Sequence, residues 1–542
     1  MVRTYIWSVL IVGFLFFSLS STFYELKRSG DLQPDRQFEL VHNFPTDYNF
    51  YLSRIREGLE GNWTSVERYT SESHSGSFIH EMYILMGHVG TWVRVPWHRA
   101  GDIYHVARVV LSFTLLALIA EFCKESLGGK RYWGVLGFML AVTASSWSKL
   151  VYVDGVARFG GYMPWWSVMD SLQRITFIPH LLAGQALIVF LIMTLATNKL
   201  LRSGNSIFLG ILAFVLGLVF PPGLLFVYCV MGVYALFQGK GMWKLVTPYI
   251  LVFLISVPSL VYLGLMTQVY PWKRLVEVDT IRPLPFDYIE YAKAIGPMGP
   301  IGLIGLIWAL FRKEKAMYPV VAWVISWISL LFVFKFVPAQ SPLRFSEMIP
   351  HIPLGILSAY LCYQIGHLGR LSYLSSLMKT MPMVLIAFGL FHMYSSFLWQ
   401  KDFIDHKIRA TTPLVPTGSY VMYPLKDFIA AIVFIQDSTL RDAIILSEST
   451  AGNYIPVYSG NRVYLGHDNT VRFESKKEEA KQFFSGIMSV SQAKVWLNEK
   501  GISRVYYGPQ EQEDAGFKDL STKYPFLINR YTNPHVTVYS ME

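Results

Sequence analysis

Long apolar runs recur along the first 400 residues of the chain and predict membrane-spanning helices. A helix that crosses a bilayer needs about 17 to 25 apolar residues, and flanking residues can complete a shorter run. We count eleven such runs. They cover residues 5–23, 103–123, 132–147, 177–197, 206–221, 223–238, 245–267, 296–311, 317–337, 349–367 and 380–399. The pattern therefore predicts a polytopic α-helical membrane protein with about eleven transmembrane helices.

A long polar segment, residues 24–102, interrupts this pattern directly after the first run. Within it, apolar side chains recur at the three- and four-residue spacing of a helix with one buried face. That stripe consists of Tyr48, Tyr51, Leu52, Ile55 and Leu59. Thr46 can cap this helix, which places Asp47 in the first turn. A carboxylate at that position can simply complement the helix dipole, or it can serve chemistry at the membrane surface.

The same segment predicts a second amphipathic helix over residues 77–95. Its aromatic side chains, Tyr83 and Trp92, suit the headgroup layer of a membrane. Six of the 13 histidines lie between His42 and His105. None of these six forms the four-residue helical pair of a zinc protease site, so we interpret them as polar residues of the interface.

After residue 400 the pattern changes to short β-rich runs that alternate with helical periodicity. The expected strands lie at 443–447, 462–466, 504–508 and 535–540, and the expected helices at 425–436, 476–487 and 491–500. This alternation predicts an α/β domain, residues 401–542, with a partly parallel sheet. No glycine-rich phosphate loop follows a strand, so a nucleotide site is not expected. His467 and Asp468 follow a strand and can line a site, although a solvated turn is the simpler interpretation.

Composition and charge favour a membrane protein and set its expected orientation. Hydrophobic residues make up 53% and charged residues 15% of the chain, which is typical of polytopic membrane proteins. The net charge of +10 comes from Lys and Arg dispersed over alternate short loops, without the basic stripe of a nucleic-acid-binding surface. By the positive-inside rule, Arg3 is cytoplasmic, and both the first polar loop and residues 401–542 are extracytoplasmic. The three cysteines lie in or beside apolar runs and imply neither a disulfide nor a zinc site.

Two local features leave alternatives open. The first run begins with basic residues and contains Ser-Leu-Ser at 18–20, as a cleaved signal peptide would, but it continues to Tyr24 and we favour a retained anchor. The Pro-Pro-Gly sequence at 221–223 separates two apolar runs, either as a tight outer turn or as a broken re-entrant hairpin.

The distribution of loops favours an enzyme over two other classes of protein. A transporter made of inverted repeats has two similar halves and intramembrane charge pairs. This chain instead has one long first loop, a soluble tail and mostly charge-free runs. A noncatalytic scaffold that displays the tail would not need aromatic residues beside an acid in the first loop. A transporter or flippase and a scaffold are therefore the alternatives to an extracytoplasmic enzyme.

The order of these features resembles the GT-C superfamily of integral-membrane glycosyltransferases. That group includes the dolichyl-phosphate-mannose protein mannosyltransferases, the bacterial aminoarabinose transferases and the oligosaccharyltransferases. The resemblance rests on the early acid in TDYNFYLSRIREGLEGNW (46–63) and on YHVARVVLSFTLLALIAEF (104–122), which opens the second run. It covers residues 1–400 and implies that they form the catalytic domain. The tail sequence ILSESTAGNYIPVYSGNRVYLGHDNT (445–470) is similar to a small extracytoplasmic domain of some uncharacterised bacterial members.

The resemblance implies a polyprenyl-phosphate-linked sugar as donor and a lipid, glycan or protein as acceptor, at the extracytoplasmic face of the cell membrane. In such enzymes the loop acid is implicated as base or metal ligand, so Asp47 is the expected catalytic residue. An ionised carboxylate can take the proton of the acceptor, while cations hold the leaving phosphate as its charge grows.

Several residues near the outer surface are candidates for binding the donor. Arg344 is the preferred phosphate clamp because a guanidinium can bind a phosphodiester through two hydrogen bonds. Alternatively, Arg344 extends to the lipid headgroups or pairs with Glu347. The remaining candidates are Arg108, Arg174, His180 and, beside the expected base, Tyr48 and Tyr51.

The need for a divalent ion, Mg²⁺ or Mn²⁺, is left open. Members of the superfamily that are similar to oligosaccharyltransferases place several acids around such an ion, and Asp154 and Asp170 are the available partners of Asp47. Neither forms a DxD or DxE motif. This departure favours the metal-independent relatives, in which a single carboxylate does the chemistry.

Overall fold

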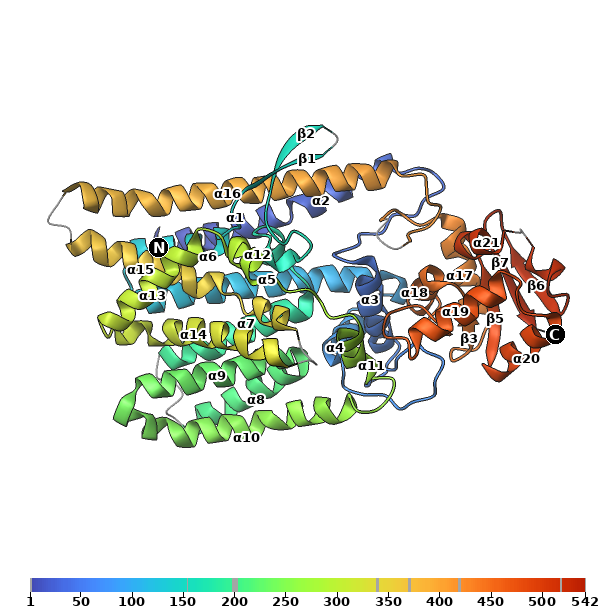
Figure 1. Cartoon of the computed structure of the whole chain (residues 1–542), viewed down its shortest axis with the longest axis horizontal. Coiled ribbons are helices and arrows are strands. Elements are labelled where there is room, and N and C mark those ends of the chain that lie inside the picture. The colour runs from blue at the N-terminus through green and yellow to red at the C-terminus, as the bar shows by residue number, and fades with distance from the viewer. Residues whose placement is uncertain are drawn as a thin grey trace. The chain divides into compact units, whose positions relative to one another are not determined.

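A computed structural model describes residues 2–153, 155–196, 203–337, 341–368, 372–417, 421–516 and 519–541, and Figure 1 labels its elements. The chain forms two compact units. The helical unit comprises residues 1–21, 106–263 and 279–400, and the α/β unit comprises residues 22–105, 264–278 and 401–542. The first polar loop therefore belongs to the same unit as the C-terminal tail, whereas the division at residue 400 expected from the sequence separates the two.

Each of the eleven predicted apolar runs coincides with a helix among the described residues. These helices are α1 Val2–Ser18, α5 Ala100–Ser126, α6 Arg131–Thr143, α7 Pro179–Ala196, α8 Ser203–Val219, α9 Pro221–Phe237, α10 Trp243–Met266, α13 Met298–Phe311, α14 Tyr318–Val333, α15 His351–Leu368 and α16 Ser372–Arg409. Four helices in the described part are long and apolar enough to cross a membrane alone, and up to six spans result if two bent pairs each count as one. The helices α7, α8 and α9 are apolar but shorter. The mostly helical, apolar fold is confirmed, and the count of eleven spans stays a prediction.

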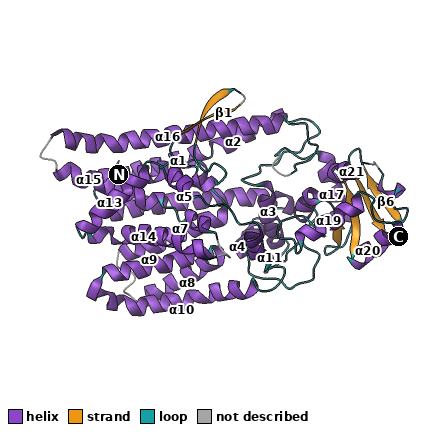
Figure 2. Cartoon of the chain, in the orientation of Figure 1, coloured by secondary structure: helices purple, strands orange, loops and turns teal. Residues whose placement is uncertain are grey.

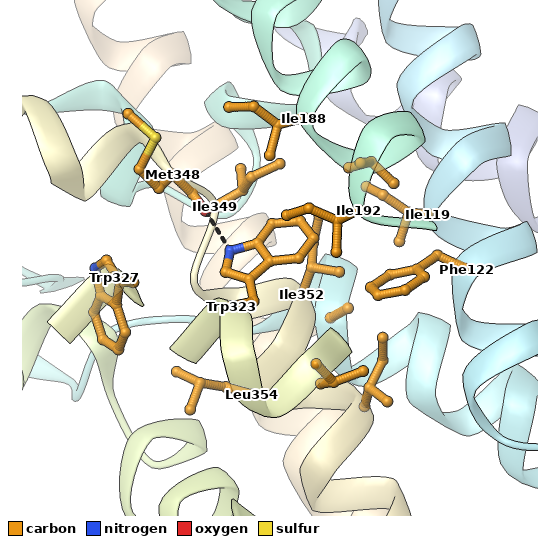
Figure 3. Packing of buried hydrophobic residues seen from close by; sticks show 14 of the residues in the cluster. Ile119, Phe122, Ile188, Ile192, Trp323, Trp327, Met348, Ile349, Ile352 and Leu354 are labelled. Carbon is orange, nitrogen blue, oxygen red and sulfur yellow. Dashed lines mark hydrogen bonds between the residues drawn. The ribbon is translucent and has the colours of Figure 1, made fainter. Parts of the chain in front are cut away.

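The core of the helical unit is apolar and close-packed around Trp323 of α14 (Figure 3). Its indole N–H donates a hydrogen bond to the carbonyl oxygen of Met348 at 2.9 Å, so the one polar group of this side chain is satisfied. The ring of Phe122 stacks on it with a centroid distance of 5.8 Å. Glycines bring neighbouring helices together, since a Cβ at Gly302 of α13 would lie only 2.9 Å from the carbonyl oxygen of Leu354 in α15.

Short elements connect the long helices. The sequence pattern did not predict the antiparallel hairpin of β1 Lys149–Val153 and β2 Val156–Gly160, in which Lys149 pairs with Gly160. The other connecting helices are α2 Ser20–Arg28, α11 Arg274–Ile281 and α12 Tyr288–Ile295.

The α/β unit combines two helices of the first loop with the whole tail. The first-loop helices are α3 Pro45–Leu59 and α4 Glu81–Trp92. The tail contributes α17 Lys426–Ser438, β3 Ile444–Leu446, α18 Ser449–Tyr458, β4 Arg462–Val463, α19 Phe473–Phe484, α20 Val490–Glu499, β5 Ile502–Tyr507, α21 Pro509–Ala515, β6 Leu527–Thr532 and β7 Thr537–Met541. Helices and strands alternate through most of this segment, and Figure 2 colours its helices purple and its strands orange.

The strands form one five-stranded sheet in the order β4-β3-β5-β7-β6. The strands β4, β3 and β5 run parallel to one another, and β7 runs antiparallel to both of its neighbours, β5 and β6. The predicted partly parallel sheet is therefore confirmed. Alternate residues face opposite sides: Ile445 and Tyr506 pack in one apolar cluster with α17 and α18, and Leu446 and Tyr507 pack in another with α19 and α20.

Candidate active site

Helix α3 carries Asp47 and begins at Pro45, two residues earlier than the predicted cap at Thr46 implies. Its N-cap is Phe44, which makes no side-chain cap hydrogen bond, and Pro45 occupies the first helical turn. Proline is common at this position because its fixed φ suits a helix and because an N–H in the first turn has no partner within the helix. The predicted cap at Thr46 is therefore wrong, because Thr46 already lies inside the helix. The predicted place of Asp47 in the first turn is confirmed.

One face of α3 packs as the apolar pattern predicts. Tyr48, Leu52 and Ile55 are buried in a cluster with Tyr83 of α4 and Tyr104 of α5. The ring of Tyr51, on the same side, stacks on Tyr83 at 4.6 Å between centroids. A Cβ at Gly58 would clash with the backbone of Ile84, so this glycine allows the close approach of α3 and α4.

The opposite face of α3 is buried as well, which the stripe does not predict. Phe50 joins the apolar cluster that contains Ile445 and Val463 of the sheet. Asn49 donates to the side chain of Asn453 in α18 at 2.9 Å, and Asn453 in turn donates to the carbonyl oxygen of Thr46 at 3.2 Å. The tail thus holds the turn that carries Asp47.

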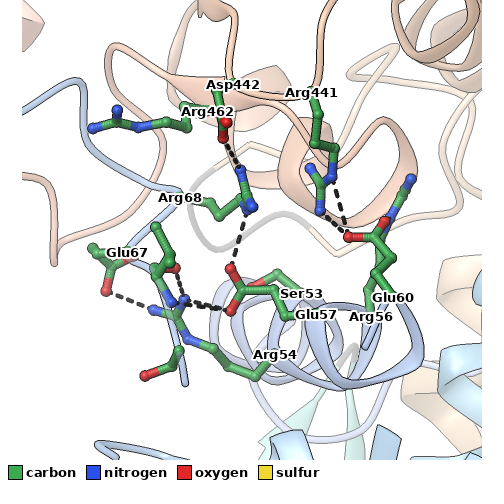
Figure 4. A network of polar contacts seen from close by, with 12 residues as sticks. Ser53, Arg54, Arg56, Glu57, Glu60, Glu67, Arg68, Arg441, Asp442 and Arg462 are labelled. Carbon is green, nitrogen blue, oxygen red and sulfur yellow. Dashed lines mark hydrogen bonds and ion pairs between the residues drawn. The ribbon is translucent and has the colours of Figure 1, made fainter. Parts of the chain in front are cut away.

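A network of charged residues fastens α3 to the tail (Figure 4). Glu57 of α3 pairs with Arg54 at 3.3 Å and with Arg68 at 3.1 Å, and Arg68 reaches Asp442 of the tail at 3.0 Å. Arg54 also pairs with Glu67 at 2.7 Å. Burial raises the pKa of Glu57, and the two arginines oppose that shift. Because a buried charge is tolerated only when it is paired, each member of this network constrains the position of the others.

The side chain of His467, from the tail, lies beside the side chain of Asp47 in space. Its Nε2 lies 3.4 Å from Asp47 Oδ1, and its side chain is only 9% exposed while that of Asp47 is 45% exposed. The ring stacks on Phe50 with centroids 4.9 Å apart. The expectation of a solvated turn at His467 is therefore wrong, because α3 covers this turn within the unit. The sequence signal was present but weak, since it consisted of a His-Asp pair after a strand.

A cavity of about 250 Å³ lies inside the α/β unit beside α3. Its lining includes Tyr48, Leu52, Glu39, His105 and Tyr458. The buried carboxylate of Glu39 accepts hydrogen bonds from the hydroxyls of Tyr458 and, at 3.1 Å, Tyr454. Burial raises the pKa of Glu39 to about 7. Nothing in the local sequence marks Glu39, because its partners lie more than 400 residues further along the chain.

Two other expectations for the first loop are wrong in part. In α4, Trp92 is 80% exposed, but Tyr83 is 1% exposed and belongs to the core instead of the headgroup layer. Of the histidines, His42 Nδ1 forms a hydrogen bond with the hydroxyl of Tyr104 at 3.1 Å. His105 Nε2 forms one with the carbonyl oxygen of Leu40 at 2.7 Å. These side chains hold the fold together, because folding places a polar partner beside them that sequence spacing does not reveal.

The preferred phosphate clamp, Arg344, lies in a 3-10 helix, Pro342–Glu347, of the helical unit. Its guanidinium is 34% exposed and pairs with Asp279 at 3.2 Å. Glu347, in the same short helix, is 2% exposed, and its Oε2 has no hydrogen-bond partner among the described residues. Burial raises the pKa of Glu347 to about 7, and Arg344 opposes this shift. Arg344 therefore has an ion-pair partner in Asp279, and its charge also acts on Glu347.

The other candidates of the helical unit lie apart from that short helix in the sequence. Arg174 is buried in a 3-10 helix, Gln173–Thr176, and donates to the carbonyl oxygens of Val142, at 3.1 Å, and Ala144. Asp170 accepts the backbone N–H groups of Leu172 and Gln173, each at 2.9 Å. His180 lies in the first turn of α7 and Arg108 is buried in α5. Asp154 lies outside the described residues.

The described His, Cys, Asp and Glu side chains do not form a cluster of metal ligands. No group of three or more His, Cys, Asp or Glu side chains converges on one point in the part of the chain that the structure describes. One nitrogen atom, Nε2 of His467, lies beside Asp47. Asp170 already accepts two backbone N–H hydrogen bonds with one of its carboxylate oxygens. Mg²⁺ is often held by only one or two carboxylates together with substrate phosphates and water, so Asp47 stays a candidate ligand for such an ion.

Comparisons with known proteins define the fold class. No family model matches the chain, and no curated protein matches it significantly. Among solved structures, the archaeal oligosaccharyltransferase AglB from Archaeoglobus fulgidus, in complex with an inhibitory peptide and a dolichol-phosphate, matches with a TM-score of 0.54 and 11% identity, over 100% of this chain and 74% of that chain. ArnT from Cupriavidus metallidurans, bound to undecaprenyl phosphate, matches with a TM-score of 0.51 and 11% identity, over 98% of both chains.

AglB and ArnT are both GT-C glycosyltransferases. At these identities the likeness defines the fold, and the chain therefore has the fold of the GT-C membrane glycosyltransferases. Together with the apolar helices, this makes it a membrane protein. The expected GT-C resemblance is confirmed, and it extends beyond residue 400 into the tail.

Proposed function

We propose that the chain is a glycosyltransferase that moves a sugar from a polyprenyl-phosphate-linked donor to a lipid, glycan or protein acceptor. The observation that carries this proposal is the likeness to ArnT bound to undecaprenyl phosphate, which covers 98% of both chains. AglB, described with a dolichol-phosphate, adds a second neighbour whose ligand is a polyprenyl phosphate.

In the proposed step Asp47 acts as the base. The acceptor hydroxyl gives its proton to the Asp47 carboxylate as its oxygen forms a bond to the anomeric carbon, and the bond from that carbon to the phosphate oxygen breaks. A base must be within hydrogen-bond reach of the proton it takes. The 45% exposure of the Asp47 side chain, in a helix turn that the tail holds, fits this role.

The leaving polyprenyl phosphate gains negative charge as the bond breaks, and a fixed cation lowers the barrier. We propose Arg344 for this role because its guanidinium is partly exposed, whereas Arg174 is buried with its N–H groups on backbone carbonyls. Tyr48, which lines the cavity beside α3, is a candidate for contact with the acceptor or the sugar.

The function is tested by donor cleavage. The purified full chain is reconstituted in liposomes with a panel of radiolabelled polyprenyl-phosphate monosaccharides and with extracted envelope glycolipids as acceptors. Transfer of label to an acceptor, with release of polyprenyl phosphate, supports the proposal. Movement of intact labelled donor between leaflets without bond cleavage would instead identify a flippase, and neither activity over the whole panel would favour a scaffold.

We further propose that residues 401–542 and the first loop are extracytoplasmic, as the positive-inside rule predicts. The cysteines of the natural chain lie at Cys123, Cys229 and Cys362, and their replacement by serine provides the background. Single cysteines at exposed Glu474 and at Lys313 are then labelled with an impermeant maleimide in intact cells. Labelling at 474 alone supports this orientation, and labelling at 313 alone reverses it.

A further inference from the structure

We propose that His467 is a positioning residue that orients the carboxylate of Asp47, an inference that rests on the proposed role of Asp47 as base. His467 belongs to the tail and Asp47 to the first loop, 420 residues apart, yet His467 Nε2 lies 3.4 Å from Asp47 Oδ1. Both residues lie within the α/β unit. The tail would then supply part of the active site.

The hydrogen bonds of the imidazole determine which nitrogen carries the proton. The backbone N–H of Asn469 donates to His467 Nδ1 at 3.1 Å. A nitrogen that accepts a hydrogen bond carries no proton, so the neutral ring has its proton on Nε2. Nε2 is the atom that faces Asp47. His467 is therefore a hydrogen-bond donor to the carboxylate.

The ring of His467 and the backbone of its turn are also held in place. Its face stacks on Phe50 with an interplanar angle of 20°. The carbonyl oxygen of His467 accepts the N–H of Thr470 at 2.8 Å, and the Thr470 hydroxyl donates to the carbonyl oxygen of Tyr69 at 2.6 Å. A donor fixed in this way is preorganised, so it needs little rearrangement when the reaction occurs.

The consequence concerns the two oxygens of Asp47. When Oδ1 accepts the N–H of His467, the carboxylate has one preferred rotation, and Oδ2 is directed away from that bond to receive the proton of the acceptor. His467 keeps its own proton throughout, and the acceptor proton ends on Asp47. Because a misplaced base loses much of its rate advantage, loss of this donor should lower kcat more than it raises KM.

Three variants of the full chain separate the donor from the ring. His467→Gln keeps an N–H donor near the position of Nε2. His467→Asn keeps an acceptor near the position of Nδ1 for Asn469 but removes the donor to Asp47. His467→Phe keeps the stacking on Phe50 and removes both polar groups. We expect kcat to fall about ten- to a hundredfold in the Asn and Phe variants, the range for a lost hydrogen bond to a charged group, and only a few-fold in the Gln variant.

A matched control exists within the tail. His535 Nδ1 lies 2.8 Å from Asp427 Oδ2, which is another His-Asp pair. His535→Asn should leave kcat unchanged. Equal losses in His535→Asn and His467→Asn would indicate a general effect on folding and would overturn the proposal, as would an inactive Gln variant beside an active Asn variant.

A double-mutant cycle tests whether His467 acts through Asp47. In the Asp47→Asn background, His467→Asn should cause no further loss of transfer, because the group that it orients is already gone. Losses that multiply would show independent action and overturn the proposal. If Asp47→Asn is inactive and His467→Asn is fully active, this inference alone fails. If Asp47→Asn itself is fully active, the proposed base is wrong.

Discussion

Two aspartate-histidine pairs among the described residues of the α/β unit lie in different surroundings. Asp47 and Asp427 each lie in the first turn of a helix and each contacts a histidine from later in the chain. The histidine beside Asp47 is 9% exposed and stacks on Phe50, whereas the one beside Asp427 is 34% exposed. The pairs differ in how firmly the histidine is held and in how far the carboxylate is exposed, 45% against 34%.

The two pairs show that residue type and helix position do not by themselves identify a catalytic carboxylate. Both aspartates complement a helix dipole, a role worth about 0.3 to 1 kcal/mol. What distinguishes Asp47 is a buried, stacked histidine beside a carboxylate side chain that is 45% exposed. The predictions below test this distinction and the contacts that hold α3.

The largest effect is expected for Asp47→Asn. The amide keeps the shape of the side chain but cannot accept a proton, so transfer should fall on the order of a hundred- to ten-thousandfold. The stability of the full chain in detergent should change by no more than about 1 kcal/mol. Asp427→Asn is the matched control and should retain normal transfer. Comparable turnover in the two variants would contradict the assignment of Asp47 as base.

A large loss of stability is expected when the charge network under α3 is broken. Glu57→Gln leaves the buried Arg54 and Arg68 without a shared counter-charge, and we expect a destabilisation of about 3 to 5 kcal/mol. Chemical unfolding of the full chain in detergent measures this change. Arg99→Ala removes half of the exposed pair with Asp102 and should cost less than about 1 kcal/mol. A small effect at Glu57 would mean that the network does not fasten α3.

The buried carboxyl of Glu39 predicts a pH dependence. Its pKa is raised to about 7, above the value of roughly 4.3 for an unfolded carboxyl. Between these values the folded chain binds more protons than the unfolded chain, so the contribution of Glu39 to stability falls as the pH rises from about 4 to about 7. Glu39→Gln cannot ionise and should gain on the order of 3 kcal/mol relative to wild type across this window.

The measurement for Glu39 is the apparent free energy of unfolding of both proteins at a series of pH values. The exposed Glu513 provides the control, since Glu513→Gln should follow the wild-type profile. Parallel profiles for wild type and Glu39→Gln would show that Glu39 ionises in the folded chain as it does in the unfolded one.

A moderate effect is expected in the helical unit at Arg344. Arg344→Lys keeps the charge but replaces the planar fork by a single ammonium. If Arg344 binds the leaving phosphate, kcat for donor cleavage should fall roughly tenfold, the value of about one charged hydrogen bond. Arg312→Lys, at the C-terminal end of α13, should leave cleavage unchanged. Normal turnover in Arg344→Lys would leave the pair with Asp279 as the role of this arginine.

The smallest effect is expected at the exposed end of α4. Trp92 is 80% exposed, so Trp92→Ser should change the stability of the full chain by less than about 0.5 kcal/mol. Tyr83→Ala, nine residues earlier in the same helix, removes a ring that is 1% exposed and should cost about 3 to 5 kcal/mol. Unfolding in detergent distinguishes the two variants, and similar losses would contradict the burial difference along α4.

Local sequence pattern determined the helical unit well, because its signal is local. Runs of apolar side chains predict long helices wherever they occur, and each predicted run corresponds to a helix from α1 to α16. The partly parallel sheet was also predictable, because β-rich runs alternate with helical periodicity. Asp47 lies in the first turn of α3 as predicted, although the Thr46 cap on which that prediction rested is wrong, because Pro45 already begins the helix.

Tertiary structure alone decided which residues surround that acid. A stripe of apolar residues reveals one buried face, but α3 is buried on its polar face by charge pairs and amide bonds to a tail some 400 residues away. Such pairs leave no periodic trace, since Glu57, Arg68 and Asp442 resemble any surface charges in the sequence. His467 lies beside Asp47 for the same reason: long-range packing, which no local pattern encodes, brings the two together.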